Sequence, residues 1–294
     1  MLTLLQISDL HFGPFFIPPV AESLVQAVHG LEPDIIVISG DFTQRAKRVQ
    51  FEEAWRYMAR LPDVPTVVVP GNHDVPLYRV LERIFSPYDL YREFINPDLD
   101  MVLRTEQAVI VALNSTAPLR AITNGRIRSR QLELCAEVFT DVPTGTARIV
   151  VTHHHLAPAP DYEGGQVMPR ARRVLERLQD LGVEIVMGGH LHRAYIGNSL
   201  DVHPGKTREH GIIIVQAGTS TSRRGRARER EKNSFNLVRI SDAVIRVTHY
   251  MFFDEVMAFA PVSRHTFPRP GKKYLVEVSA GGTEEPALRR RFEG

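Results

Sequence analysis

Five short apolar runs of this 294-residue chain each lead into carboxylate, imidazole or amide side chains. The valine run at 67–69 stops at a proline and a glycine and continues with Asn72, His73 and Asp74. The other four runs lead into Asp9 with His11, into Asp41, into His153, His154 and His155, and into His190 with His192. Carboxylate and amide oxygens and neutral imidazole nitrogens are the donors that hold hard to borderline divalent cations. The sequence therefore predicts a metal site.

The lack of thiols at these positions narrows the kind of metal site. Cys135 is the single cysteine of the chain, so it forms no internal disulfide. Because no set of thiolates is available for a structural zinc site, a catalytic site with open positions is expected instead. Cys135 lies in a stretch with helical spacing, and we interpret it as a buried core residue.

Buried strands that end in tight turns are expected to carry these donors to one place. Strands are predicted at 2–7, 34–38, 66–69, 108–114, 148–152, 185–187, 211–216, 235–240 and 244–250, with the strand at 66–69 in a central position. Helices are predicted at 20–31, 51–61, 130–139 and 170–181. This alternation of strands and helices favours parallel βαβ units, followed by an antiparallel end of a second sheet.

Two further segments have weaker patterns. The aromatic residues between 76 and 100 show no clear period, and we interpret this segment as short helices that cover the entrance of the site. In the helix at 51–61, one face is expected to be buried, made of Phe51, Ala54, Trp55, Met58 and Leu61.

The five motifs occur in the order Asp-x-His, Gly-Asp, Gly-Asn-His-Asp, His and Gly-His-x-His, between Asp9 and His192. This order resembles the calcineurin-like metallophosphoesterase superfamily, and the pattern is most similar to that of bacterial class III cyclic-nucleotide phosphodiesterases. The resemblance implies an α/β fold, a four-layer α-β-β-α sandwich with two mixed sheets inside and helices outside. We expect this domain to span residues 1–255, with a loosely packed C-terminal extension at 256–294.

The resemblance also implies two divalent metal ions, which are manganese, iron or zinc. It assigns Asp9, His11, Asp41 and His192 to the first ion, and Asp41, Asn72, His153 and His190 to the second. A shared carboxylate, here Asp41, meets the requirement of holding two dications roughly 3.5 to 4 Å apart. Among the three consecutive histidines His153 is preferred because it comes first after the strand, as in the family pattern, and His154 is the alternative. If these segments are extended, residues i and i+2 share a face, which pairs Asp9 with His11 and His190 with His192.

His73 resembles the catalytic histidine of the family, which contacts the phosphate and protonates the leaving oxygen without binding metal. Asp74 is expected to orient it, since the role of a histidine depends on the partner of its second nitrogen. Two dications and the carboxylates of Asp9 and Asp41 leave a charge of +2, or about +1 once an anionic nucleophile is present. That charge matches a phosphodiester monoanion. The nearest further cation in the sequence is Arg193, whose side chain is expected to point away from the ligands.

We therefore expect a hydrolase of phosphodiester bonds in cyclic nucleotides or other small phosphodiesters. A nuclease is the alternative suggested by Arg223, Arg224, Arg226, Arg228 and Arg230, although Glu229 and Glu231 interrupt this charge and favour a solvated loop. A non-enzymatic scaffold is disfavoured because every ligand position is filled. The net charge of +2 is too small to indicate nucleic acid or membrane. With no run of ~18 apolar residues and no basic leader, a cytoplasmic protein without a membrane span is expected.

Overall fold

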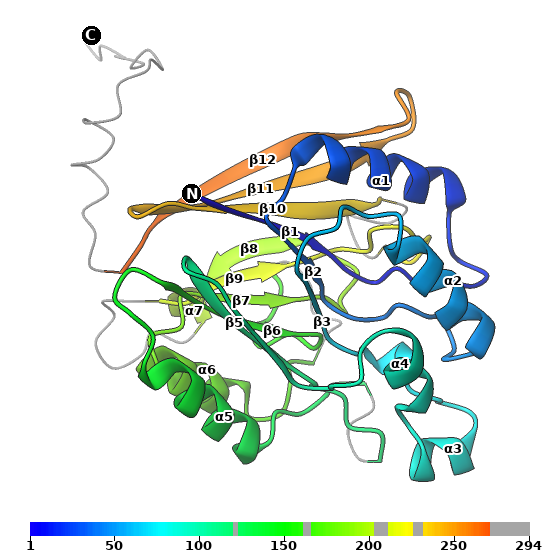
Figure 1. The fold of residues 1–294 in the computed structure, drawn as a ribbon, viewed down its shortest axis with the longest axis horizontal. Helices are drawn as coiled ribbons and strands as arrows, with labels where there is room; N and C mark the ends of the chain where they lie inside the picture. The colour runs from blue at the N-terminus through cyan, green and yellow to red at the C-terminus, as the bar shows by residue number, and fades with distance from the viewer. Residues whose placement is uncertain (120–122, 161–165, 203–210, 226–231, 271–294) are drawn as a thin grey trace, which may run out of the picture.

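Two sheets stacked face to face form the centre of the molecule, and helices cover their outer faces (Figure 1). The computed structural model describes residues 1–119, 123–160, 166–202, 211–225 and 232–270. In this part of the chain one sheet has the strand order β12-β11-β10-β1-β2-β3 and the other β4-β5-β6-β7-β9-β8. Both combine parallel and antiparallel pairs. The predicted four-layer α/β sandwich with two mixed sheets is confirmed.

The elements have the following bounds. The first sheet contains β1 (Leu2–Ile7), β2 (Ile35–Ile38), β3 (Thr66–Val68), β10 (Ser234–Ile240), β11 (Val244–Phe253) and β12 (Ala258–Pro268). The second contains β4 (Met101–Arg104), β5 (Ala108–Leu113), β6 (Ala147–Thr152), β7 (Ile185–Gly188), β8 (Tyr195–Asn198) and β9 (Ile213–Gln216). The helices are α1 (Pro18–Leu31), α2 (Arg48–Met58), α3 (Val80–Phe85), α4 (Asp89–Phe94), α5 (Ser129–Thr140), α6 (Ala171–Asp180) and α7 (Ser199–Val202), with a short 3₁₀ turn, η1, at Asn72–Asp74.

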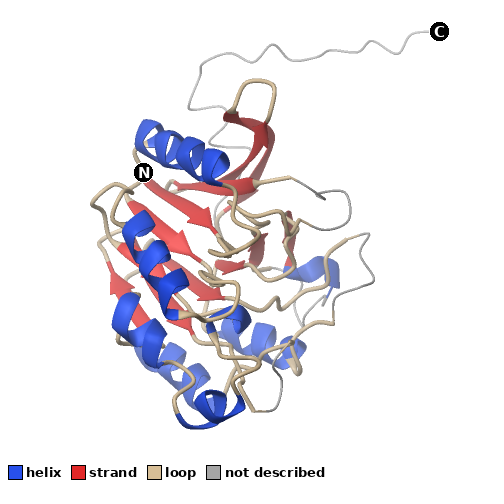
Figure 2. Ribbon diagram, turned by 90° about the vertical axis from the view of Figure 1, so that its right-hand side faces the viewer, coloured by secondary structure: helices blue, strands red, loops and turns tan. Residues whose placement is uncertain are grey.

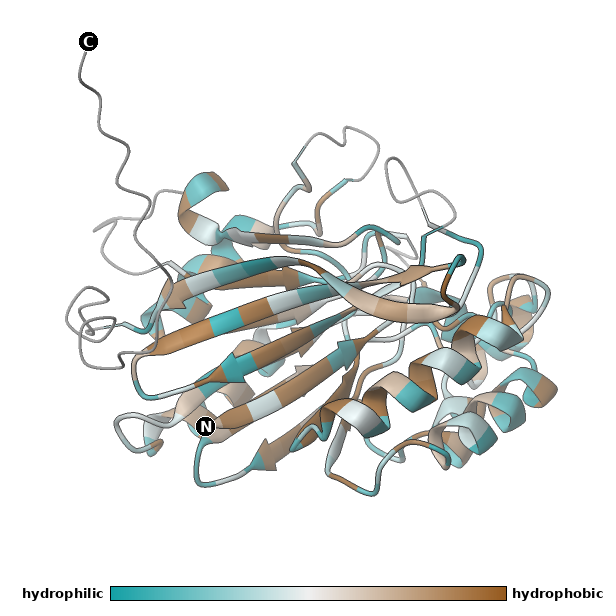
Figure 3. Cartoon of the chain, turned by 90° about the horizontal axis from the view of Figure 1, so that it is seen from above, coloured by the Kyte–Doolittle hydropathy of each residue, from teal (hydrophilic) through white to brown (hydrophobic). Residues whose placement is uncertain are grey.

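Alternation along the strands divides the core into layers. Leu4, Val37 and Val67 pack between the two sheets, whereas their neighbours Leu5 and Ile36 pack beneath the helices. Strands covered on both faces need apolar residues at every position, which explains the continuous runs in the sequence. In Figure 3, hydrophobic residues run along the strands. The helices in the same view alternate between hydrophobic and hydrophilic residues. Figure 2 shows the helices flanking the strands.

Two details, one in the first sheet and one in the helix α2, differ from the prediction. Strand β3 is at the edge of its sheet and not in the centre, because the sheet continues from β1 through β10 on the other side. In α2, Trp55 is 54% exposed and Tyr57 is buried instead, with its hydroxyl donating to the carbonyl of Ala21. The predicted short helices at 76–100 are present as α3 and α4.

Strand β12 continues the first sheet beyond the expected end of the domain. It pairs with β11 along its full length, from Ala258 to Pro268. The expectation that residues from 259 onward are loosely packed is therefore wrong for 259–268. The strand contains Pro261 and Pro268, and proline is compatible with an edge strand, where half of the backbone N–H groups have no partner strand. Residues 271–294 lie outside the described residues, and the domain boundary at 255 stays a prediction.

The carboxyl ends of β1, β2, β3, β6 and β7 lie along one edge of the sandwich (Figure 1). Parallel strands bring the residues that follow them to the same side, which is where α/β proteins place their sites. Among the described helices none is long and apolar enough to cross a membrane.

Candidate metal centre

Four of the predicted ligands form one buried cluster after β1, β2 and β7. It consists of Asp9, His11, Asp41 and His192, whose ligand atoms lie within 4.8 Å of one another. The Nε2 atoms of His11 and His192 are 2.9 Å apart, and His192 Nε2 lies 3.1 Å from Asp9 Oδ1. These four side chains are at most 2% exposed. The structure thus brings together all the residues assigned to the first ion.

The residues assigned to the second ion also converge. Asn72 Oδ1 lies 2.8 Å from His190 Nδ1 and 3.2 Å from His153 Nε2. Asp41 Oδ2 lies 3.4 Å from the same His153 nitrogen. Within the described residues His153 and His190 also form a compact group with His154.

Asp41 stands between the two groups. Its Oδ1 accepts a hydrogen bond from the backbone N–H of His73 at 2.8 Å. Its Oδ2 is buried without a hydrogen-bond partner, although it lies 3.7 Å from His11 Nε2 and 3.4 Å from His153 Nε2. A buried carboxylate oxygen needs a compensating partner. The convergence of lone pairs on both sides of this oxygen fits divalent cations, so the residues present match the implied metals.

The backbone at the ligands is unusual. Asp9, His11, Asp41, His190 and His192 all have positive φ, between 51° and 74°. Asp9 and His11 do belong to one group, whereas His190 and His192 belong to different groups. The reason given for the pairs is wrong, because these residues are left-handed and not extended. Side chains rarely tolerate this region, and such conformations concentrate at functional sites. The strand-end turns therefore direct consecutive donors to one point.

Two glycines allow the ligand segments to approach each other. A Cβ on Gly71 would lie 2.1 Å from Asp41 Oδ1, and one on Gly189 would lie 2.0 Å from Ser8 Oγ. Any larger residue would displace a ligand or its neighbour. The requirement for glycine in the two motifs thus comes from the packing of one ligand loop on another.

A second layer of hydrogen bonds fixes the ligands. His153 Nδ1 lies 2.8 Å from Ser39 O, and His192 Nδ1 lies 2.8 Å from Arg224 O. Each ring thereby donates from Nδ1 and directs Nε2 toward the cluster. Asp9 Oδ2 accepts from Ser8 Oγ at 2.7 Å. These contacts orient the donor atoms toward the cluster.

Protonation in the cluster follows from burial and mutual proximity. Burial raises the pKa of Asp41, but the imidazoles of His153 and His73 outweigh it and hold that pKa well below its usual value. Burial lowers the pKa of His11 to about 3. Burial also lowers the pKa of His153, but the Asp41 carboxylate outweighs this effect and raises it to about 9. A cation bound here would therefore displace a proton from His153.

Of the two candidates, His153 has the geometry better suited to a ligand. His153 Nε2 faces both Asp41 and Asn72, as described above. His154 Nδ1 instead lies 2.8 Å from Ser115 Oγ. Its Nε2 is buried without a hydrogen-bond partner, and its ring centroid is 4.6 Å from that of His190. His154 thus lines the centre on the side of the second group.

His73 lies beside the first group, with its ring centroid 4.9 Å from that of His11. The prediction that Asp74 orients this ring is wrong, since His73 Nδ1 lies 2.9 Å from the carbonyl oxygen of Gln44. The η1 turn directs Asp74 away from its neighbour toward the loop after β2. In that loop it accepts from the backbone N–H groups of Phe42 and Thr43, and it also accepts from the backbone N–H of Gly71, just before η1. Burial, followed by the charge of Asp41, raises the pKa of Asp74 to about 7.

The structure places Arg224 beside the site, a position that the sequence did not indicate. Arg224 donates to Gln44 Oε1 at 2.9 Å, and its charge contributes to the lowered pKa of His73, after the larger effect of burial. It had been grouped with the arginines of a solvated loop. Arg223 is exposed, whereas Arg226, Arg228 and Arg230 lie outside the described residues. Arg193, named above as the nearest further cation in the sequence, is buried, with 1% of its surface exposed. A contact from a loop after β9 to the loop after β2 has no local sequence signal.

Comparisons with known proteins agree with this geometry. The sequence profile of the family described as calcineurin-like phosphoesterase matches residues 2–194. A curated protein, a probable glycerophosphodiester phosphodiesterase from Arcobacter nitrofigilis, is 26% identical over 167 residues, which are 55% of this chain and 58% of that protein. The chain thus spans less than two thirds of this relative.

Solved structures share the fold at low identity. A purple acid phosphatase from yellow lupin (Lupinus luteus) superposes with a TM-score of 0.69 at 14% identity, over 98% of this chain and 57% of that one. A dimetal phosphatase from Danio rerio gives a TM-score of 0.64 at 13% identity, over 91% and 99%. The profile match covers well over half of the chain, so the chain belongs to the calcineurin-like phosphoesterase family, which confirms the resemblance. The family is described as one of phosphoesterases.

Proposed function

We propose that this protein hydrolyses phosphodiester bonds with two divalent metal ions that share the Asp41 carboxylate. The observation that carries the proposal is the position of Asp41 Oδ2, buried without a hydrogen bond between His11 Nε2 and His153 Nε2. The first ion is assigned to Asp9, His11, Asp41 and His192, and the second to Asp41, Asn72, His153 and His190. The nitrogen and oxygen donors suit manganese, iron or zinc.

The two ions, when bound, would supply Lewis acidity and lower the pKa of water at the site. The remaining chemistry belongs to the protein. His73 is held through Nδ1 by the Gln44 carbonyl, which leaves Nε2 for the substrate. A proton on that nitrogen would be transferred to the leaving oxygen as the ester bond breaks. Asp74 supports this arrangement indirectly, because it fixes the loop that contains Gln44.

The preference for diesters is supported by the curated relative, whose name describes a phosphodiesterase. The ligand charges also match a monoanionic diester. Arg224 weakens the argument from charge, because it places an additional positive charge near His73. Hydrolysis of phosphomonoesters, which are dianions, is therefore the second candidate. Small diesters such as cyclic nucleotides are preferred over nucleic acids, and location in the cytoplasm stays a prediction.

The test uses metal-free protein restored with each divalent ion in turn. Hydrolysis of bis-p-nitrophenyl phosphate, p-nitrophenyl phosphate, 3′,5′-cyclic AMP and single-stranded DNA is then compared at low and moderate salt. The proposal expects metal-dependent cleavage, with the diesters ahead of the monoester and little effect of salt. Faster cleavage of p-nitrophenyl phosphate would favour the monoesterase. Salt-sensitive degradation of DNA would favour a nuclease, because binding to the polymer releases counterions.

A further inference from the structure

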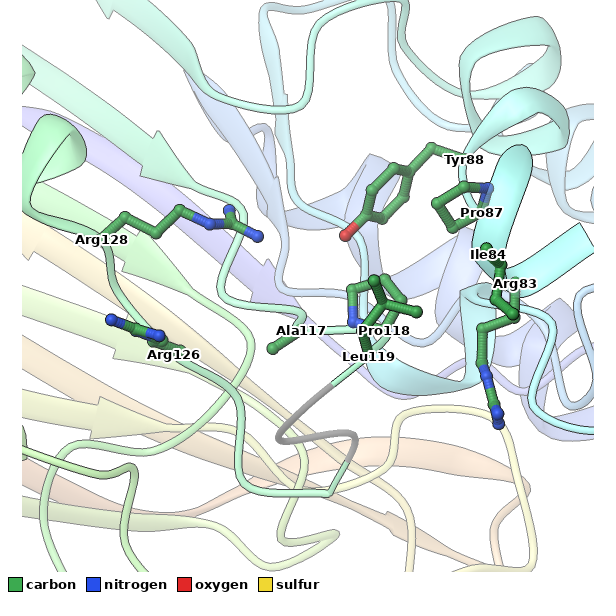
Figure 4. Close-up of a pocket in the computed structure, with 9 residues that line it drawn as sticks. All are labelled: Arg83, Ile84, Pro87, Tyr88, Ala117, Pro118, Leu119, Arg126 and Arg128. Atoms are coloured by element: carbon green, nitrogen blue, oxygen red, sulfur yellow. The ribbon is translucent and has the colours of Figure 1, made fainter. Parts of the chain in front are cut away.

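A cavity of about 360 Å³ lies between the α3–α4 segment and the loop that follows β5 (Figure 4). Residues from α3 and α4 and the turn between them line one side, namely Arg83, Ile84, Pro87 and Tyr88. The opposite side is lined by Ala117, Pro118, Leu119, Arg126 and Arg128. The proposed metal ligands and His73 are not part of this lining.

The cavity adjoins the metal centre through the residues that follow β5. Ser115 Oγ lies 2.8 Å from His154 Nδ1, and the carbonyl of the same Ser115 accepts from the backbone N–H of Arg126 at 2.7 Å. On the other side, the Tyr88 hydroxyl lies 2.6 Å from Thr116 Oγ1. The cavity therefore lies on the side of the centre where His154 is found.

Three arginines line this cavity, and two of them, Arg126 and Arg128, belong to the segment that follows β5. Ile127 between them is 8% exposed and packs in the core, so alternation along an extended segment places both arginines on the opposite face. They lie on the same side of the cavity, and Arg128 extends toward Tyr88 (Figure 4). In the described part of the chain neither guanidinium has a hydrogen bond or an ion pair. Arg83, by contrast, donates to the carbonyl of Leu77.

We propose that this cavity binds a terminal phosphate of the substrate, so that the preferred phosphodiesters carry a second phosphate on one ester arm. The proposal rests on the proposed function. Arg126 and Arg128 offer two guanidinium groups, and Arg83 adds a third positive charge to the lining, so the cavity suits the charge of roughly −1.5 to −2 on a phosphomonoester near pH 7. Arginine forms bidentate hydrogen bonds with phosphate oxygens. The side chains of Pro87, Tyr88 and Leu119 offer an apolar surface to the body of the same arm.

The first test measures binding to the metal-loaded protein by calorimetry. Thymidine 3′,5′-bisphosphate is compared with thymidine 5′-monophosphate, since one phosphate can occupy the metal centre in both. We expect the bisphosphate to bind roughly 10- to 100-fold more tightly, as charge-assisted hydrogen bonds to one phosphate would give. The Arg126→Ala/Arg128→Ala variant should lose most of this preference. Arg130→Ala, which removes a nearby exposed arginine outside the cavity, should retain it.

The second test measures kcat/KM for thymidine 5′-(p-nitrophenyl phosphate) with and without a 3′-phosphate. Both esters release nitrophenolate, so any difference reports on the second phosphate. The native protein and the Arg130→Ala control should favour the 3′-phosphorylated ester, and the double variant should not. Equal binding of the two nucleotides by the native protein, or an unchanged preference in the double variant, would overturn the anion site. A retained binding preference without hydrolysis of any ester would contradict the proposed function and uphold the anion site.

Discussion

His73 is the residue whose chemistry can be separated from metal binding. Its Nδ1 is hydrogen-bonded to Gln44 O, and it is not a member of either ligand group. His73→Ala should therefore keep both metal ions and slow hydrolysis by roughly 10² to 10⁴, the range for a lost general acid. The loss should be smaller for nitrophenolate than for a poor alkoxide leaving group, which needs the proton more. Equal losses for both leaving groups would argue against proton donation and leave a role in phosphate positioning.

At the scale of elements, Asp74 connects the η1 turn to the loop after β2. Its carboxylate accepts from three backbone N–H groups and from Thr43 Oγ1. Asp74→Ala would leave buried donors without partners, at a cost of about 1 to 3 kcal/mol for each unsatisfied group. With three backbone N–H groups left without their acceptor, we expect a total loss of at least roughly 3 kcal/mol in the free energy of unfolding, measured with urea, and slower turnover through displacement of Gln44. Thr43→Val, which removes one hydroxyl, should cost less, and an Asp74→Ala protein as stable as the native one would contradict this role.

The pairing of β10 with β11 contains a titratable group. His249 is 7% exposed, and its Nδ1 lies 2.9 Å from Asn236 Oδ1. Burial, with a smaller effect from His265, lowers the pKa of His249 from 6.5 to about 4. Because the unfolded chain binds this proton more readily, the stability contributed by neutral His249 is present above pH 6.5 and is lost as the pH falls toward 4. The expected loss is up to roughly 3 kcal/mol.

This pH dependence can be isolated with a substitution. The free energy of unfolding of the native protein is compared with that of His249→Gln between pH 4 and 7. The native slope should exceed that of the variant, while His29→Gln at an exposed position serves as the control. Parallel curves for the native protein and His249→Gln would show that His249 is not responsible.

At the scale of the whole molecule, a buried ion pair joins the two sheets at the end opposite the metal centre. Arg269 follows β12, Glu184 precedes β7, and two hydrogen bonds of 2.7 Å connect their side chains. Each side chain is less than 9% exposed. Removing one partner leaves a buried charge, so Glu184→Ala should lower the free energy of unfolding by about 3 to 5 kcal/mol. Glu184→Leu with Arg269→Met should cost much less, and similar losses in the single and double variants would refute the coupling.

The sequence predicts those parts of the fold in which local pattern and tertiary environment agree. Strands β1, β2, β6 and β7 are buried on both faces, so each appears as an unbroken apolar run followed by its ligand. Strand β12 and the edge strand β4 have exposed positions and no such run, and they were missed. The proposed ligands could be identified because motifs carry them. The roles of Asp74, Gln44 and Arg224 could not, since they depend on contacts between separate loops.

The measurement that tests the central claim most directly is the number of metal ions bound per chain, in the native protein and in Asp41→Ala. Asp41 Oδ2 faces both ligand groups, so one substitution should weaken both sites. We predict two divalent ions per native chain, and loss of most metal and of turnover in Asp41→Ala, while Asp180→Ala at an exposed helix end behaves as native. An Asp41→Ala protein that retained two ions per chain and a near-native rate would contradict the shared carboxylate.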